Sequence, residues 1–354
     1  MANIIMGCTT NSGINNGKID AYLLDFPQAG YTDLVTIDNR LIAFAEKDTL
    51  SQNGDGLVQE ETSYLYASEG DTSLTHFELP SDEICPQDFA RYSHFKNLPD
   101  GRIGIIKTCF GLFTGNRFQD HSFMLAYDWH SQKLEQLVKG TLGEWIEAGD
   151  FTWNPSLTRG IHYDTHGTIY WMTPTGIAPM HIQVYDQGTE WYLDEIHYDA
   201  TYNPDLCTGD STAPAWSPDG LTISFFASGD VKNRNCPPHT LFRYDLYFMD
   251  PNILRPTLAL SGVTAPAFSL WSPNSKRIVF SGRTGPQNQF GLWLFTPETN
   301  SLELIDTGYF YNAIWISNRD IAAIKCFETE ISACGRTEIW KYGVNVAKVL
   351  SKSR

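Results

Sequence analysis

The sequence predicts an all-β protein: a six-bladed β-propeller of four-stranded antiparallel blades, with seven blades as the less favoured count. Three observations predict it, namely repeated strand–turn–strand units, tight turns that recur along the chain, and strands rich in aromatic and β-branched residues. The clearest units begin at Trp216-Ser-Pro-Asp-Gly220 and Trp271-Ser-Pro-Asn-Ser275. Two further short apolar strands complete each of these units, as a propeller blade requires.

The same turn can be followed through the rest of the chain. An apolar strand follows each turn, and the last turn residues lie at positions 39, 101, 167, 220, 275 and 318. Residues 19–354 are therefore expected to form one propeller domain, preceded by a flexible tether at 1–18. The strand Ala21–Asp25 is expected to close the ring against the last blade, and Ser131–Val138 is expected to be an outer strand rather than a helix.

Two of the units resemble a known repeat. The segment Trp216–Gly220, taken with Asp245-Leu-Tyr-Phe-Met-Asp250, resembles the repeat of TolB-like (WD40-like) β-propellers. The resemblance is specific in the fourth and fifth units, is recognisable in the sixth through Trp315, and is weak in the first three. It implies an exported, periplasmic or cell-surface protein that acts through a protein partner.

Two functions are consistent with these observations. The leading hypothesis is a non-catalytic propeller that acts as a protein-binding or scaffold module. The alternative is a carbohydrate-active hydrolase or lyase with its site in the central mouth of the propeller, because fold alone does not decide function. Convergent carboxylates or a metal ion in that mouth would favour the enzyme, and a mouth filled by side chains would favour the scaffold.

The charge balance excludes one class of partner. The chain carries 25 Lys and Arg against 41 Asp and Glu, a formal net charge of −16. A surface this acidic repels nucleic acid, so a DNA- or RNA-binding role is not expected. No apolar run approaches the ~20 residues that a membrane helix needs.

The propeller order suggests a pairing for six of the seven cysteines. Two of the predicted disulfides join an inter-blade segment to the blade that follows it, and the third closes one long loop. They are Cys85–Cys109, Cys207–Cys236 and Cys326–Cys334. Three disulfides would imply an oxidising compartment, whereas buried free thiols are the alternative. No clustered Cys/His spacing indicates a metal site.

The seventh cysteine, Cys8, follows Ile5-Met-Gly7, which resembles the end of a bacterial lipoprotein signal. A lipid on Cys8 would be the only membrane attachment and would make the protein an outer-membrane lipoprotein. Residues 1–6 lack the basic start and the apolar region of a signal peptide. The native start is therefore longer, or the resemblance is accidental.

One acidic segment resembles a calcium loop. Ligand oxygens at alternate positions and a glycine at the sharp turn are typical of such loops. The segment 51–62 has this spacing but places Ser51 and Thr62 where acidic ligands are expected. The candidate ligands for a structural Ca²⁺ are Asp48, Asn53, Asp55, the Leu57 carbonyl, Glu60 and Glu61. The alternative is an exposed acidic turn.

Four long inserts are expected on one face of the propeller, as loops between second and third strands. They are Glu46–Glu61, Phe110–His121, Gly229–His239 and Phe327–Arg336. Loops on a rigid scaffold often carry function. Simple tolerance of insertions at an exposed loop is the alternative.

No catalytic residue can be assigned from the sequence. The Gly-x-Ser-x-Gly elbow of the hydrolases that carry such propellers is absent. His162 and His166 flank Asp164 and suggest a metal site, but an exposed tight turn with one packed histidine, on the face opposite the long loops, is the favoured interpretation. Asp150 and Glu147, near Trp145 and Trp153, are candidate carboxylates in a sugar-binding cleft.

Overall fold

The computed structural model of the chain describes residues 19–52, 58–80, 84, 90–114, 117–140, 142, 148–164, 169–179, 183–186, 189–192, 211–228, 243–326 and 337–344. Nearly all of them lie in antiparallel strands or in the turns between strands. The only helix in these ranges is a 3-10 turn at Pro297–Thr299. None of their helices is long and apolar enough to cross a membrane. The all-β prediction is therefore confirmed.

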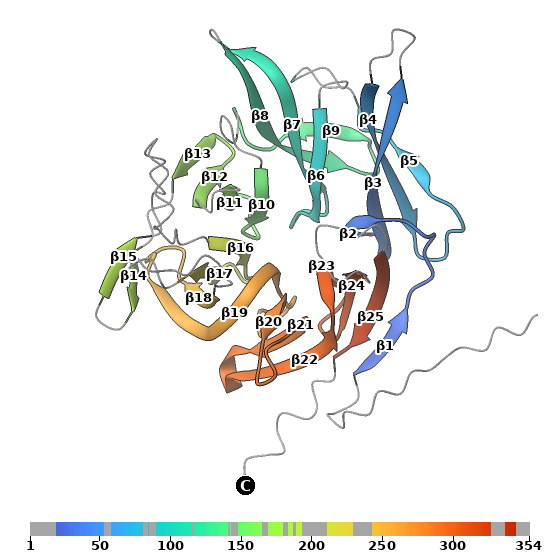
Figure 1. Cartoon of the computed structure of the whole chain (residues 1–354). Helices are drawn as coiled ribbons and strands as arrows, with labels where there is room; N and C mark the ends of the chain where they lie inside the picture. The colour runs from blue at the N-terminus through green and yellow to red at the C-terminus, as the bar shows by residue number, and fades with distance from the viewer. Residues whose placement is uncertain are drawn as a thin grey trace, which may run out of the picture.

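The strands form a β-propeller of small antiparallel sheets arranged around a central axis (Figure 1). There are four four-stranded sheets, one seven-stranded sheet and one two-stranded hairpin among the described residues. Each sheet stands with one edge strand toward the axis, except that the β14–β15 hairpin lies at the outside and the seven-stranded sheet contributes two inner strands (Figure 1). These inner strands are β2 (Tyr31–Ile37), β6 (Ala90–Asn97), β10 (Ala148–Trp153), β16 (Ser211–Trp216), the second half of β19 (Pro256–Trp271) and β23 (Tyr309–Trp315).

The remaining strands follow outward in chain order within each sheet. Those of the first three sheets are β3 (Arg40–Gln52), β4 (Val58–Ser68), β5 (Thr75–Phe77), β7 (Ile103–Thr114), β8 (Arg117–Asp128), β9 (Lys133–Gln136), β11 (Gly160–Asp164), β12 (Ile169–Thr173) and β13 (Gly176–Pro179). Those of the rest are β14 (Gln183–Asp186), β15 (Thr189–Tyr192), β17 (Ile223–Ser228), β18 (Arg243–Met249), β20 (Ile278–Thr284), β21 (Gln289–Thr296), β22 (Ser301–Thr307), β24 (Asp320–Cys326) and β25 (Thr337–Gly343). The expected outer strand within 131–138 is confirmed as β9, which pairs with β8.

Strand β19 joins two groups of strands into the seven-stranded sheet. Its first half pairs with β18, and its second half pairs with β20. The two halves meet at a register shift between Thr264 and Phe268. Gly262 and Ala265 have positive φ angles of 82° and 47° at this bend. Strand β19 is thus the outer strand of one four-strand group and the inner strand of the next.

The ring is closed by a strand from the N-terminal end of the described chain. Strand β1 (Asp20–Leu23) pairs with β25, with Asp20 opposite Gly343 and Leu23 opposite Trp340. The expected closing strand is therefore confirmed, with slightly different bounds. Strand β1 comes from the N-terminal end and β25 from the C-terminal end of the described chain. Their pairing covers the edge of β25 that would otherwise be unpaired.

Aromatic side chains fill the space between neighbouring sheets. Phe44 and Phe95 stack between the first two sheets, with ring centroids 4.4 Å apart. Phe77 stacks on Trp129 in the same cluster, at 5.9 Å. The short apolar strands of the sequence therefore pack face to face, and burial of their side chains supplies the main stabilisation of the ring.

The tight turns after β10, β16 and β19 share one hydrogen-bond pattern. After β16, the Ser217 N–H donates to the Thr222 carbonyl at 2.8 Å, and the Thr222 N–H donates to Ser217 Oγ at 2.9 Å. After β10, the Asn154 N–H donates to the Arg159 carbonyl at 2.9 Å, and the Arg159 N–H donates to Asn154 Oδ1 at 3.1 Å. Both turns are therefore the same structure in different sequences.

This pattern corrects the third predicted turn. The turn of the third sheet lies at 154–159, with Leu157 at φ 54°, whereas residue 167 lies in the connection between β11 and β12. The equivalent residues Gly220 and Ser275 have φ 76° and 57°. A leucine in this left-handed conformation is uncommon and carries no sequence signal, so the prediction for the third unit was displaced.

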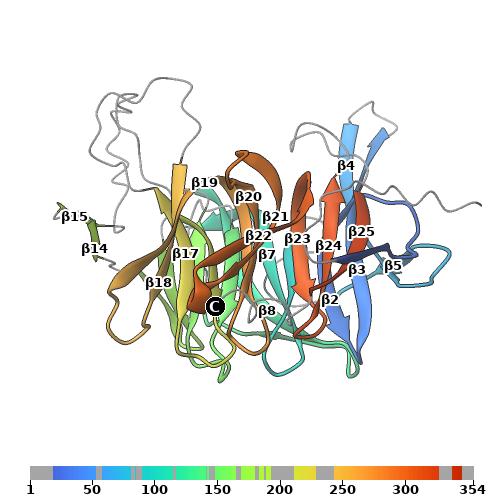
Figure 2. The ribbon, with the colours of Figure 1, turned by 90° about the horizontal axis from the view of Figure 1, so that it is seen from below.

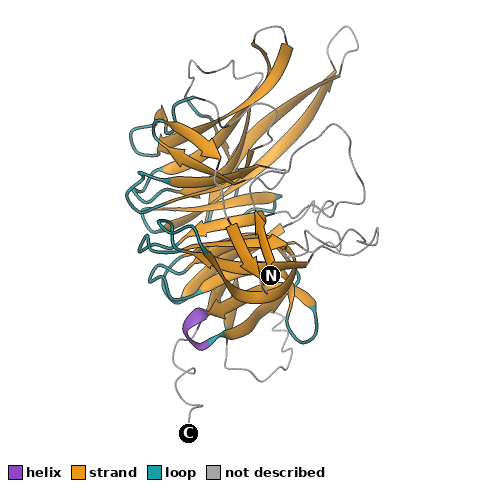
Figure 3. Ribbon diagram, turned by 90° about the vertical axis from the view of Figure 1, so that its left-hand side faces the viewer, coloured by secondary structure: helices purple, strands orange, loops and turns teal. Residues whose placement is uncertain are grey.

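Two of the predicted long loops are mostly hairpin. Strand β3 continues to Gln52 and pairs with β4 from Val58, and β7 continues to Thr114 opposite Arg117. The loop predictions for Glu46–Glu61 and Phe110–His121 are therefore wrong over most of their length, because the ladders extend beyond the neighbouring strands. Both hairpins project from the side opposite the tight turns (Figures 2 and 3). We call this side the loop face; inserts 229–239 and 327–336 lie outside the described residues.

Candidate functional site

Every inner strand is interrupted by a register shift. The shifts are Tyr31/Asp33, Ser93/Lys96, Ala148/Phe151, Thr212/Ala215, Thr264/Phe268 and Phe310/Asn312. Such bulges re-aim side chains and are over-represented beside active sites. The shifts therefore mark one level around the axis as the place to look for a site.

An ion pair lies at this level between β6 and β10. The Lys96 ammonium donates to the carboxylate of Asp150, and the two side chains are only 22% and 12% exposed. His94 Nδ1 lies 4.0 Å from Asp150 Oδ1, and the Phe151 N–H donates to Asp150 Oδ1 at 2.7 Å. His94 itself has a φ of 55°, an unusual conformation for a non-glycine residue. Asp150 is thus held by two cationic or polar neighbours and one backbone donor.

The environment of Asp150 keeps it ionised. Burial by itself would raise the pKa of Asp150, but the Lys96 ammonium, His94 and the Phe151 N–H outweigh that effect and hold the pKa below its ordinary value. Asp150 therefore remains a carboxylate at neutral and mildly acidic pH.

A second carboxyl group, Asp33 on β2, has the opposite environment. Asp33 is buried, accepts a hydrogen bond from Asn312 Nδ2 at 3.2 Å, and accepts another from Thr32 Oγ1 at 3.0 Å. Burial raises the pKa of Asp33, the charge of Asp150 raises it further, and His94 and Lys96 only partly oppose the increase. The two carboxyl groups therefore interact, and their pKa values are pushed apart.

His162 on β11 lies behind this pair. Its side chain is fully buried, and neither ring nitrogen has a hydrogen-bond partner among the described residues. The pKa of His162 is lowered to about 4, mainly by burial and also by nearby His94, while Asp150 partly opposes the decrease. The ring stacks on Tyr170 with centroids 6.1 Å apart. We call Asp33, His94, Lys96, Asp150 and His162 the axial cluster.

The position of His162 corrects the prediction for His162–His166. Strand β11 is a second strand, so its connection to β12 lies on the loop face and not on the opposite face. His162 is buried, as expected of one of the two histidines, but it lies in the strand itself and not at a tight turn. His166 lies outside the described residues.

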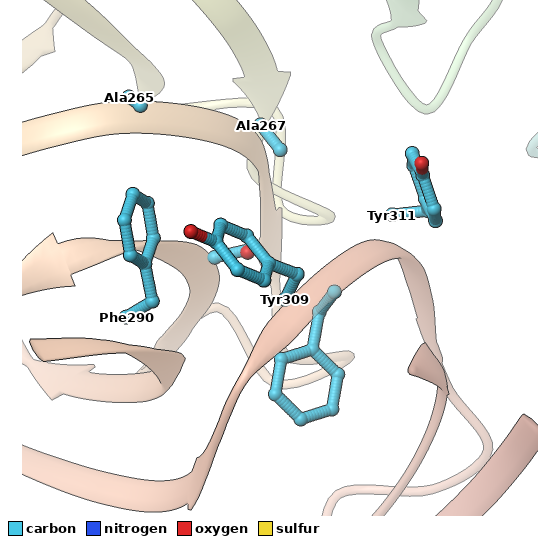
Figure 4. Close-up of a pocket in the computed structure, with 7 residues that line it drawn as sticks. Ala265, Ala267, Phe290, Tyr309 and Tyr311 are labelled. Atoms are coloured by element: carbon cyan, nitrogen blue, oxygen red, sulfur yellow. The ribbon is translucent and has the colours of Figure 1, made fainter. Parts of the chain in front are cut away.

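An aromatic cavity lies between strands β19, β20 and β21 on one side and β23 on the other. It measures about 20 Å³ and is lined by Ala265, Ala267, Ser281, Phe290, Tyr309, Phe310 and Tyr311. The rings of Phe290 and Tyr309 face each other with centroids 4.4 Å apart, and Tyr311 stands apart from them (Figure 4). This volume holds only about one water molecule, so the cavity is a shallow aromatic site rather than a deep pocket.

The aromatic cavity and the axial cluster are linked through strand β23. Tyr311 lines the cavity, and the next residue, Asn312, donates its side-chain hydrogen bond to Asp33. Asp33 in turn interacts with His94, Lys96 and Asp150. The loop-face end of the axis therefore presents ionisable groups from β2, β6 and β10 and aromatic rings from β21 and β23.

The sequence had indicated only part of this site. Of the predicted cleft residues, Asp150 is in the axial cluster and Trp153 is buried in the core, while Trp145 and Glu147 lie outside the described residues. Asp33, His94 and Lys96 were missed. The available signal was the presence of charged side chains in strands that face the axis of the ring.

The calcium prediction falls largely outside the described residues. Asn53, Asp55 and Leu57 lie there, whereas Asp48, Glu60 and Glu61 belong to the β3–β4 ladder. No group of three His, Cys, Asp or Glu side chains that could hold a metal occurs in the described part of the chain. Calcium binding stays a prediction.

Two of the predicted disulfide cysteines have described positions. Cys109 on β7 and Cys326 on β24 are buried, and each is disulfide-bonded. Their partners are not among the described residues, which exclude Cys8, Cys85, Cys207, Cys236 and Cys334. The three pairings and the lipid on Cys8 therefore stay predictions.

No protein-family model and no curated protein matches this chain. Similar solved structures include TolB from Acinetobacter baumannii, with 10% identity over 80% of this chain and a TM-score of 0.44. A putative TolB from Agrobacterium tumefaciens has 16% identity over 68% of this chain and 72% of its own, with a TM-score of 0.43. An oligogalacturonate lyase from Vibrio parahaemolyticus has 10% identity over 93% of this chain and 99% of its own, at 0.41.

This chain spans 60% of the Acinetobacter TolB chain. The low identities and TM-scores carry no functional information. The β-propeller arrangement that the TolB-like resemblance implies is present in the strand pairing of the chain itself.

Proposed function

We propose that the chain is a carbohydrate-binding propeller and that the loop-face end of the axis is its binding site. The observation that carries this proposal is that strand β23 lines the aromatic cavity with Tyr309 and Tyr311 and also holds Asp33 of the axial cluster through Asn312. Sugars present both apolar C–H faces and hydroxyl groups, so aromatic rings beside charged hydrogen-bonding groups match their chemistry. Tyr309 and Tyr311 supply the rings, and His94, Lys96 and Asp150 supply the polar groups.

Tyr309→Ala is expected to weaken carbohydrate binding at least about tenfold, equivalent to about 1.4 kcal/mol. The substitution removes the ring that faces Phe290 across the cavity. Binding is measured by calorimetry with hexasaccharides of glucose, xylose, N-acetylglucosamine and galacturonate.

Tyr22→Ala is the matched control for Tyr309→Ala, because Tyr22 is 59% exposed on β1, at the outer edge of the ring. The proposal is wrong if none of the four hexasaccharides binds, or if Tyr22→Ala weakens binding as much as Tyr309→Ala.

A protein partner is the second candidate, favoured by apolar residues on the tight-turn face. Leu221 and Ile253 are each 69% exposed in turns of the β16–β19 group. Exposed apolar side chains of this kind can serve a protein interface. A protein that binds there would be displaced by Leu221→Asp and left in place by Tyr309→Ala, which separates the two candidates.

Six blades remain our proposal for the ring. The bend at Thr264–Phe268 supports it, because it divides the seven-stranded sheet into β16–β19 and β19–β22, which share β19. With the four separate four-stranded sheets, this division gives six groups of four.

Export to an oxidising compartment is likewise proposed, supported by the disulfide-bonded Cys109 and Cys326. Lipid attachment at Cys8 belongs to the same proposal, and periplasmic or cell-surface location follows from both.

We retain a structural Ca²⁺ at the tip of the β3–β4 hairpin as a proposal, supported by the acidic residues of this segment. Asp55→Ala is then expected to lower the melting temperature in calcium and to have little effect in chelator. At a hundredfold excess over the dissociation constant, the ion would stabilise the folded state by about 2.7 kcal/mol. Thermal unfolding with and without chelator measures this. If chelator leaves the melting temperature of the wild type unchanged, the calcium proposal is wrong and the segment is an exposed acidic turn.

A further inference from the structure

We propose that strand β1 is an interaction surface whose outer edge pairs antiparallel with β1 of a second copy of this chain. The strand occupies Asp20–Leu23 and ends the four-stranded sheet β1–β25–β24–β23. It lies at the outside of the ring (Figure 1). The proposal is therefore independent of the carbohydrate site, and the two can fail separately.

The side chains of β1 remain exposed although the strand closes the ring. All four are exposed, and the two large apolar ones, Tyr22 and Leu23, are 59% and 55% exposed. The only charged residue of the strand is Asp20, at its first position. An exposed sheet edge with apolar side chains is a ready template for pairing with another chain.

The other outer strands of the four- and seven-stranded sheets carry features that discourage such pairing. Strand β9 places Lys133 and Glu135 in an exposed ion pair at 2.7 Å, and β22 carries Glu303. Strand β13 ends at Pro179, and β5 is only three residues long. Charged side chains, proline and short strands are the means by which sheet proteins protect their edges. Among these outer strands, β1 alone combines an uncharged centre with large exposed side chains.

The pairing of β1 with β25 shows which backbone groups of β1 face outward. The Leu24 N–H donates to the Ile339 carbonyl at 2.9 Å, so the backbone groups of Leu24 point toward β25. Successive residues of an antiparallel strand direct their backbone groups to alternate sides. The N–H and C=O groups of Ala21 and Leu23 therefore point away from β25. No strand of the described part of the chain pairs with them there.

A two-fold axis at Tyr22 satisfies these outward groups. Ala21 then lies opposite Leu23 of the second copy, and the two residues exchange both backbone hydrogen bonds. The axis repeats the same pairing on its other side, as in every isologous contact. The two Tyr22 residues form the central pair without hydrogen bonds, in which side chains lie closest together. Aromatic pairs across two strands add to the stability of a ladder.

The charges of β1 favour this register and explain how a second copy is accepted. At a net charge of −16, two copies repel each other, so their contact must keep like charges apart. An axis at Tyr22 separates the two Asp20 residues by ~13 Å along the strand, which exceeds the Debye length of ~8 Å at physiological salt. An axis at Ala21 would leave only ~7 Å between them.

Sedimentation equilibrium of the full chain at physiological ionic strength tests the association. We expect a monomer–dimer equilibrium, and we expect Leu23→Pro to weaken it at least about tenfold. Proline removes an N–H that donates to the second copy, and the two-fold axis makes each substitution count twice. The Leu23 N–H points away from β25, so the substitution leaves the closure of the ring in place. A melting temperature close to that of the wild type checks this.

Leu23→Glu is a second variant that keeps the test independent of proline. It places like charges ~7 Å apart along the strand across the axis, so the dimer should weaken here as well. Leu258→Glu is the matched control, because Leu258 is 52% exposed on β19, outside the β1 sheet. It adds the same charge to the chain and should leave the dimer unchanged.

Tyr22→Cys tests the position of the two-fold axis. Opposed residues of a pair without hydrogen bonds have Cα atoms ~4.5 Å apart, within the ~4.4–6.8 Å that a disulfide spans. The substitution is made together with Cys8→Ser, which removes the one cysteine without a predicted partner. Mild oxidation should then give a covalent dimer on non-reducing electrophoresis. Leu258→Cys in the same background should remain a monomer on the gel.

Three results would overturn the proposal. A chain that stays monomeric at every concentration would leave the edge of β1 to a strand of another protein. A dimer that Leu23→Glu and Leu258→Glu weaken equally would have its interface elsewhere. A dimer that Tyr22→Cys does not cross-link would exclude the two-fold axis at Tyr22.

Discussion

Replacing Lys96 by methionine is expected to lower the free energy of unfolding by about 3 to 5 kcal/mol. Lys96 is the ammonium partner of Asp150, and both side chains are largely buried. Methionine preserves most of the aliphatic volume but leaves the Asp150 carboxylate with no cation in direct contact other than His94 at 4.0 Å. An unpaired buried charge is far more costly than an absent pair. Urea unfolding at neutral pH measures the change.

The double variant Lys96→Met with Asp150→Asn is the control for this prediction. Asparagine keeps an oxygen for the Phe151 N–H while removing the charge. We expect the double variant to be more stable than Lys96→Met alone, by about 2 kcal/mol or more. Equal stability of the two variants would show that the pair contributes through packing rather than charge.

The pH dependence of this effect has a definite sign. The folded-state pKa of Asp150 is lowered, so the contribution of the pair is present at neutral pH. It is lost as the pH falls through the folded-state pKa, because the unfolded chain is already protonated there. The difference between wild type and Lys96→Met should therefore shrink in strong acid.

The repeats of the sequence were sufficient to predict the fold class, because each repeat contains a turn whose structure is determined by a few neighbouring residues. The turns that start with Ser217 and Ser272 combine a capping side chain with a residue that tolerates positive φ. Such turns can be recognised from a few residues. The third turn escaped recognition because Leu157 occupies the left-handed position.

The axial cluster could not be predicted from the sequence for a different reason. Side chains alternate between the faces of a regular strand, and that alternation is what a sequence pattern detects. The register shifts at Tyr31/Asp33, Ser93/Lys96 and Ala148/Phe151 break the alternation where Asp33, His94, Lys96 and Asp150 lie. The convergence of three different blades also depends on ring closure, which no local pattern contains.

The wild type is expected to lose stability as the pH falls from about 6.5 to about 4, and His162→Phe is expected to abolish that loss. The pKa of His162 is about 4 in the folded protein, whereas an unfolded chain has the ordinary value near 6.5. As the pH falls through this window, His162 becomes protonated in the unfolded chain but stays neutral in the folded protein. The free energy of unfolding therefore drops, by up to about 3 kcal/mol at the lower end.

Phenylalanine suits this position because it keeps a buried aromatic ring and removes the imidazole nitrogens. Neither nitrogen has a hydrogen-bond partner in the described part of the chain, and the ring already stacks on Tyr170. The variant should therefore be at least as stable as the wild type at neutral pH, since two unpaired polar atoms are removed from a buried site.

Urea unfolding of wild type and His162→Phe at a series of pH values isolates this contribution. Groups that titrate in both proteins cancel in the difference, except for His94 and Asp150, which interact directly with His162. The lowered pKa of Asp150 places its own titration below the window, so the difference between pH 6.5 and 4 reports His162 with only His94 as a coupled group. If the free energies of unfolding of the two proteins change with pH in parallel, His162 is protonated as readily in the folded protein as in the unfolded chain. The assignment of a buried neutral imidazole behind the ion pair would then be wrong.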